Sequence, residues 1–137
     1  MEKQRRLFAG SKNPTDRRRT IVWLMESMIE ERIQRTESAV KTAENISADE
    51  KAELLGLLAK LKSALGKVSQ THHEDAQSIA RFAEASTHEA TRKKKKTKLL
   101  KSALHGLKQS VEEFEASHPE LVATVNQFAT LLADIGL

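Results

Sequence analysis

Two runs of basic side chains are the residues of this chain best suited to bind a ligand. The first run is Arg17, Arg18 and Arg19, and the second, within residues 92–101, contains Arg92, Lys93, Lys94, Lys95, Lys96 and Lys98. Guanidinium and ammonium groups bind phosphates, although a lysine acts as a point charge and reads no base sequence by itself. No aromatic residue lies among the lysines, so stacking on single-stranded bases is not supported.

Charge is distributed unevenly along the chain, so the two basic runs stand out from the rest of the sequence. The net charge is +4, yet residues 92–101 alone hold seven Lys or Arg and no acid. Most of the remaining body is mildly acidic. One interpretation is that both runs contact an anionic polymer or surface, such as DNA, RNA or acidic lipid. The other is that the second run is a solvated helix end or connector, which is the common role of charged runs.

Residues typical of catalysis or metal binding occur without the required spacing. His72 and His73 are adjacent, so on a helix they would diverge by about 100° and could not easily face one metal ion. The chain has no cysteine, which excludes disulfides, thiol catalysis and thiolate metal sites. No HExxH, phosphate-binding glycine loop or GxSxG pattern is present. We therefore expect no catalytic, cofactor-binding or metal-binding residue, and no enzymatic activity.

The elements that must position the basic runs are helices. Apolar residues recur three and four positions apart along most of the chain, which predicts an all-α fold. The expected helices cover about residues 17–44, 48–90, 92–116 and 119–135, the second being either continuous, or broken or bent near 70–73. Residues 1–15 are expected to form a basic flexible leader, and residues 16–137 a single helical domain.

The first expected helix contains an electrostatic conflict. Its first turns would hold Arg17 to Arg19, and positive charge there opposes the helix dipole by about 0.3–1 kcal/mol per exposed site. Fraying of the helix up to Thr20, or a compensating anion, would relieve this. From Val22 onward the apolar stripe has a mean spacing between 3.5 and 3.6, which suits packing in a bundle or coiled coil.

The clearest element is a helical hairpin over Leu99–Leu137. Ser117 and Glu120 flank Pro119 in the pattern of a capping box, and Gly136 suits the left-handed position after a helix end. Two similar boxes begin at Ser47 and Thr71. Because a short junction makes two helices antiparallel neighbours, the predicted architecture is an elongated, coiled-coil-like antiparallel bundle with a C-terminal helical hairpin.

The same segment resembles a known family. The turn Phe114-Glu115-Ala116-Ser117-His118-Pro119, the apolar helix after it and the ending Ile135-Gly136 are similar to the C-terminal end of short bacterial helical proteins, catalogued as a domain of unknown function. The resemblance covers roughly the last quarter of the chain and extends weakly to Ser47–Leu65. The basic leader and Arg92–Lys98 are additional to the family pattern. The resemblance implies an all-helical, non-membrane protein and transfers no catalytic residue.

Composition indicates how such helices would be used. Aromatic residues make up 4% of the chain, so the helices meet along thin apolar seams. Such seams favour a non-enzymatic interaction or scaffold protein that associates with partner helices or with copies of itself; sequence-nonspecific binding of an anionic polymer or surface is the alternative. No run approaches the roughly 20 apolar residues of a membrane span. Ile21–Met25 is too short for a signal-peptide core of about seven residues, so the expected location is the cytoplasm.

Overall fold

The computed structural model describes residues 14–137, and within that range every regular element is helical. The elements are α2 (Pro14–Thr42), α3 (Ala48–Val68), α4 (His73–Thr91), α5 (Thr97–Gln109), the short 3₁₀ helix η1 (Glu112–Phe114) and α6 (Pro119–Gly136). The prediction of an all-α bundle with a C-terminal hairpin is confirmed. None of the helices in the described range is long and apolar enough to span a bilayer.

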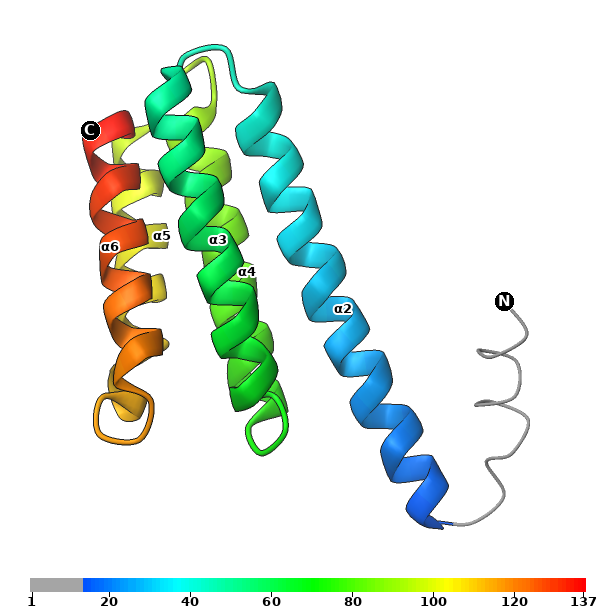
Figure 1. Ribbon diagram of the computed structural model, residues 1–137. Coiled ribbons are helices and arrows are strands. Elements are labelled where there is room, and N and C mark those ends of the chain that lie inside the picture. The colour runs from blue at the N-terminus through cyan, green and yellow to red at the C-terminus, as the bar shows by residue number, and fades with distance from the viewer. Residues whose placement is uncertain (1–13) are drawn as a thin grey trace.

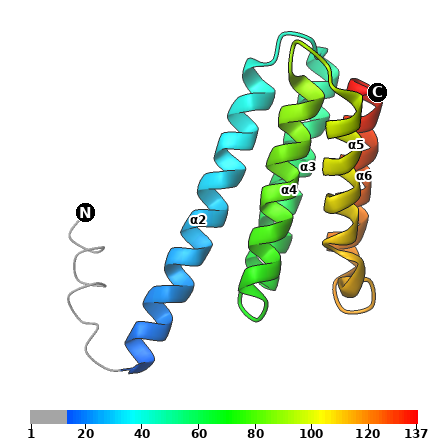
Figure 2. The same ribbon diagram turned by 180° about the vertical axis from the view of Figure 1, so that it is seen from behind.

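Successive helices run antiparallel, as Figures 1 and 2 show from opposite sides. The α2–α3 loop, the α4–α5 loop and the C-terminus lie at one end of the bundle, which we call the loop end. The α3–α4 and α5–α6 turns lie at the other, which we call the turn end. Helix α4 contacts α2, α5 and α6, while α3 contacts α2 and α6. Helix α2 diverges from the others toward its N-terminus.

A single apolar cluster holds these helices together. Leucines supply most of the buried face of α3, whereas the buried face of α4 consists mainly of small side chains, which lets three helices approach it closely. The largest fully buried side chains are Phe128, Ile33, Leu54, Leu58, Leu61, Leu65, Ile79, Leu100, Leu107, Leu121, Leu132 and Val40. The apolar seams of α3 to α6 are thus buried within one chain, so a partner helix would have to pack against α2.

Of the three predicted capping boxes, only the one that begins at Ser47 forms. The Ser47 Oγ accepts a hydrogen bond from the Glu50 backbone N–H (3.1 Å), and the Glu50 side chain accepts one from the Ser47 N–H (3.0 Å). The prediction at Ser117 is wrong, because the N-cap of α6 is His118. Pro119 excludes the residue before it from the helical region, so the cap cannot fall one residue earlier.

The box predicted at Thr71 is also wrong. The chain is still in a turn there, since the backbone N–H groups of Thr71 and His72 both donate to the carbonyl oxygen of Val68. His72 therefore becomes the N-cap of α4. Of the alternatives left open near 70–73, the helix breaks there, and the chain reverses its direction between α3 and α4.

The third predicted helix, 92–116, is shorter than expected at both ends. Residues 92–96 form the α4–α5 loop, and α5 begins at Thr97. Adjacent lysines offer no apolar side chain to bury and repel one another at helical spacing, so the reversal falls on them. At the other end α5 stops at Gln109, and η1 carries Phe114 into the core.

Both ends of the chain depart from expectation. Helix α2 begins at Pro14, inside the segment predicted as a leader, and proline is well tolerated in a first helical turn. Residues 1–13 of that predicted leader lie outside the described residues. Gly136 is the last residue of α6 and has no positive φ, so the left-handed conformation predicted for it is wrong. A Cβ there would collide with the Leu100 side chain and make a tight contact with the Cα of Ala90, which makes close packing the reason for glycine.

Candidate interaction surfaces

The second basic run forms an exposed connection at the loop end, which we call the lysine loop (residues 92–98). It joins the end of α4 to the first turn of α5 and lies beside the α2–α3 loop. With its amide oriented to satisfy both neighbours, Asn45 donates to the carbonyl oxygen of Thr91 (3.2 Å) and accepts from Nζ of Lys95 (3.1 Å). The two loops are therefore held together by hydrogen bonds.

Two of the predicted anion-binding residues in the lysine loop have structural roles. Nζ of Lys95 also donates to the carbonyl oxygen of Ala90, one of the last carbonyls of α4, where a positive charge complements the helix dipole. Nη1 of Arg92 forms an ion pair with Oε1 of Glu89 at 2.7 Å, and both side chains are largely shielded from solvent. These two residues are already occupied within the chain.

The other four predicted lysines, Lys93, Lys94, Lys96 and Lys98, are exposed. Among the described residues, none of them takes part in an ion pair with an acidic side chain. Because they are packed into six consecutive positions, their charges repel one another and attract anions. This part of the lysine loop can contact phosphate groups without displacing an internal contact.

The first basic run lies at the other end of the molecule. Arg17 and Arg19 are exposed in the first turns of α2, which Figure 1 places beyond the turn end; the side chain of Arg18 is outside the described part. Helix α2 rises about 1.5 Å per residue, so roughly 35 Å separate Arg19 from the end of α2 beside the lysine loop. The two basic runs therefore do not form one surface.

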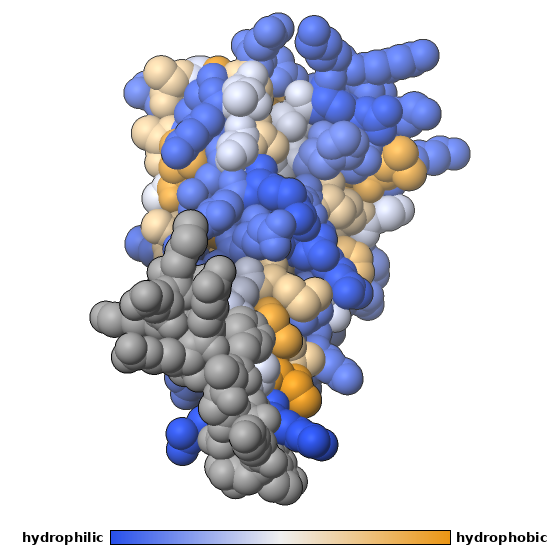
Figure 3. Space-filling view, turned by 90° about the vertical axis from the view of Figure 1, so that its right-hand side faces the viewer, coloured by the Kyte–Doolittle hydropathy of each residue, from blue (hydrophilic) through white to orange (hydrophobic). Residues whose placement is uncertain are grey.

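The N-terminal half of α2 carries an exposed apolar surface. Ile21, Leu24 and Met28 expose 55%, 42% and 50% of their area, whereas α2 is anchored to the core from Ile29 onward. We call these three residues the apolar stripe of α2. Figure 3 looks onto this helix and shows apolar surface gathered toward its lower part, with hydrophilic surface above and below it.

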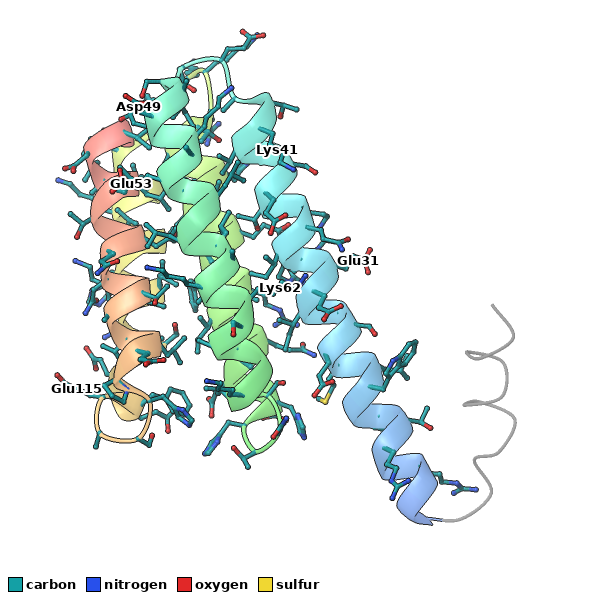
Figure 4. All side chains as sticks on the ribbon, in the orientation of Figure 1. Glu31, Lys41, Asp49, Glu53, Lys62 and Glu115 are labelled. Carbon is teal, nitrogen blue, oxygen red and sulfur yellow. The ribbon has the colours of Figure 1, made fainter. Side chains whose placement is uncertain are left out.

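Ion pairs join α2 to α4 on the C-terminal side of the apolar stripe. Glu84 of α4 accepts from Nη1 of Arg32 at 2.7 Å and from Nε of Arg35 at 3.0 Å. The hydrogen bond to Glu84, and then its negative charge, raise the pKa of Arg35. Below these pairs, toward the N-terminus, α2 diverges from α3 and α4 (Figure 4), which leaves its apolar stripe uncovered by the described part of the chain.

Histidines at the turn end have a structural role that the sequence did not reveal. The ring of the buried Phe114 lies edge-on to His72 (5.3 Å between centroids) and to His118 (5.8 Å). The two turns are thereby joined through one aromatic side chain. No sequence spacing signals this contact, because His72 and His118 lie in different hairpins. Within residues 14–137, no three His, Asp or Glu side chains are placed to hold a metal ion.

Comparison with known proteins gives one match. Neither the comparison with curated proteins nor that with solved structures gives a significant match. A family model described as "Domain of unknown function (DUF4404)" matches residues 54–137, well beyond the last quarter on which the resemblance was seen. The matched range begins within α3 and includes the lysine loop, while α2 lies before it. Since the match covers more than half of the chain, this protein belongs to the DUF4404 family.

Proposed function

We propose that this protein is a non-enzymatic helical interaction protein that self-associates through the N-terminal half of α2. The supporting observation is the apolar stripe, Ile21, Leu24 and Met28, half-exposed at the spacing of a helix–helix seam. A contiguous apolar surface rimmed by polar residues is typical of an interaction site. The cytoplasmic location expected from the sequence is part of this proposal, and imaging of a fluorescent fusion tests it.

The energetics favour a weak complex. Full burial of an Ile, Leu or Met is worth about 1.5–3 kcal/mol, so covering three half-exposed side chains on each of two copies contributes about 4.5–9 kcal/mol. Association costs at least about 4 kcal/mol in lost motional freedom. The apolar stripe alone therefore gives a Kd of about 0.2 mM at the tightest, and charged contacts around it would strengthen the complex.

Sedimentation velocity and light scattering over a concentration series test the proposal. We expect the mass to rise with concentration, and Leu24→Gln combined with Met28→Gln to abolish the rise without loss of helicity in circular dichroism. Leu99→Gln is the matched control, because Leu99 is similarly exposed (47%) but lies on α5. A monomer at every concentration up to about 1 mM would contradict the proposal.

The lysine loop supports a second function, binding of an anionic polymer. The supporting observation is that four of its side chains are exposed and form no ion pair among the described residues: Lys93, Lys94, Lys96 and Lys98. Lysines that neutralise phosphates release condensed counterions, so affinity for duplex DNA would fall steeply with salt. Such binding would be independent of base sequence.

A titration of duplex DNA at several salt concentrations tests this function. Replacement of these four lysines by Gln should weaken binding and reduce the slope of log K against log salt by about three to four. The matched control replaces Lys60, Lys62, Lys67 and Lys108, which are also exposed and change the net charge equally. Equal effects of the two quadruple variants would show that net charge, and not the lysine loop, governs binding.

A further inference from the structure

The apolar stripe of α2 is the middle of a longer surface with opposite charges at its two ends. Along α2, exposed residues follow one another at intervals of four, three, four and three: Arg17, Ile21, Leu24, Met28 and Glu31. This is the alternation of a helix–helix seam. It is basic at the N-terminal end, apolar in the middle and acidic at the C-terminal end, where Glu30 is also exposed.

This order of side chains is symmetric about Leu24, apart from the sign of charge. If a second copy of α2 ran antiparallel with Leu24 opposite Leu24, residue pairs would have numbers summing to about 48. Ile21 would then lie near Met28 of the other copy, and Arg17 would face Glu31. A parallel, in-register pair would instead place Arg17 against Arg17 and Glu31 against Glu31, and like charges across a seam are unfavourable.

We propose that two copies of this chain pair through antiparallel α2 helices centred on Leu24, with the arginines of each copy facing the acidic residues of the other. This inference rests on the proposed self-association and specifies its surface and direction. The pairing uses residues 14–34 of each helix, so the two bundles lie at opposite ends of the complex.

The internal contacts of α2 leave this pairing possible. Arg32 and Arg35 bind Glu84, and both arginines lie C-terminal to Glu31, the acidic end of the exposed surface. Glu31 lies 3.6 Å from Nη1 of Arg35 in an exposed pair, the kind that contributes little and can be exchanged. Figure 4 shows Glu31 on the side of α2 that faces away from α3.

The acidic residues also argue against a lipid surface as the occupant. A helix that lies on a membrane combines an apolar face with a basic polar face. Glu26, Glu30 and Glu31 would be repelled by acidic headgroups, whereas a second copy of the chain places Arg17 opposite Glu31. Charge complementarity therefore favours a second copy.

Cysteine cross-linking measures the direction of pairing, because the chain contains no native cysteine. At a concentration where scattering shows the dimer, Leu24→Cys should cross-link to itself on mild oxidation. Arg17→Cys alone should not, since its two copies would lie about 21 Å apart along the axis. A mixture of Arg17→Cys and Glu31→Cys chains should form the mixed disulfide. Ser102→Cys, exposed on α5, reports random collisions.

Each other outcome overturns the inference in a distinguishable way. Self-linking of Arg17→Cys at the yield of Leu24→Cys would show parallel pairing and leave self-association standing. A dimer in which Leu24→Cys links no better than Ser102→Cys would place the interface elsewhere. A monomer at all concentrations would overturn both the inference and the proposed function. So would binding to vesicles of acidic phospholipid by a chain that remains monomeric in solution.

Discussion

At the scale of single residues, two glycines of this bundle have different structural roles. A Cβ at Gly136 would collide with Leu100 and approach the Cα of Ala90 at 3.0 Å, so the end of α6 depends on the missing side chain. A Cβ at Gly56, in the middle of α3, would meet no atom within 4 Å. The first glycine permits packing, while the second only weakens its helix.

We therefore predict that Gly136→Ala lowers the free energy of unfolding by about 1–3 kcal/mol through overpacking against a backbone atom. Gly56→Ala should raise it by about 0.5–1 kcal/mol, because alanine restricts the unfolded chain and favours the helix. Urea unfolding followed by circular dichroism measures both. Equal effects of the two substitutions would show that Gly136 has no special packing role.

The same scale shows where local sequence signals fail. Three segments carry the pattern of a capping box, yet only the one beginning at Ser47 forms it. At the other two, the N-cap is a histidine, set by Pro119 in one turn and by hydrogen bonds to Val68 in the other. A four-residue pattern does not show where the preceding turn ends, and the end of that turn determines which residue becomes the N-cap.

At the scale of elements, the start of α3 depends on the one box that forms. Ser47→Ala should lower the free energy of unfolding by about 0.5–2 kcal/mol, because the N–H of Glu50 loses its acceptor. Ser117→Ala is the matched control and should change stability by much less, since its hydroxyl caps no helix. Thermal unfolding of the two variants gives the comparison, and a larger loss at Ser117 would refute it.

The docking of α2 onto α4 depends on another element-scale contact. Glu84→Gln removes the charge that binds Arg32 and Arg35, so we predict faster hydrogen exchange in the anchored part of α2, with α6 unchanged. The pKa of Arg35 is raised by Glu84, and a raised arginine pKa stabilises the fold at every pH below its unfolded value. That stability is lost only as the pH rises through the raised pKa, far above neutral, so titration of Arg35 should not change the stability of α2 across the neutral range. Uniform acceleration in all helices would contradict this prediction.

Much of the element scale could be predicted from the sequence. Apolar spacing of three and four identified the seams of α2, α3, α5 and α6, because burial of a helix face requires that period. The placement of 92–96 in a helix was wrong, although a solvated connector was left open, because lysine is a good helix former and a lysine run does not show where a helix ends. The divergence of α2 was also missed. Its apolar pattern continues from Ile29 toward the N-terminus, but the local sequence does not show that α3 and α4 are too short to cover that part of the helix.

At the scale of the whole molecule, the separation of the two candidate surfaces has a functional consequence if both proposals hold. The apolar stripe and the lysine loop lie toward opposite ends of α2. In an antiparallel dimer centred on Leu24, each lysine loop would lie about 27 Å from the dimer axis, so the two would be about 54 Å apart. That spacing corresponds to about 16 base pairs of duplex DNA.

We therefore predict that the dimer binds long duplexes with both lysine loops. Affinity should be at least about 100-fold higher for a duplex of about 40 base pairs than for one of about 10, because the second contact becomes intramolecular. Leu24→Gln with Met28→Gln should remove most of this length dependence and leave the affinity for the short duplex unchanged. Fluorescence anisotropy with the two duplexes, at protein concentrations where scattering shows the dimer, measures the effect. A length dependence that persists in this variant would mean that a single copy provides both contacts, which the separation of the basic runs on one chain argues against.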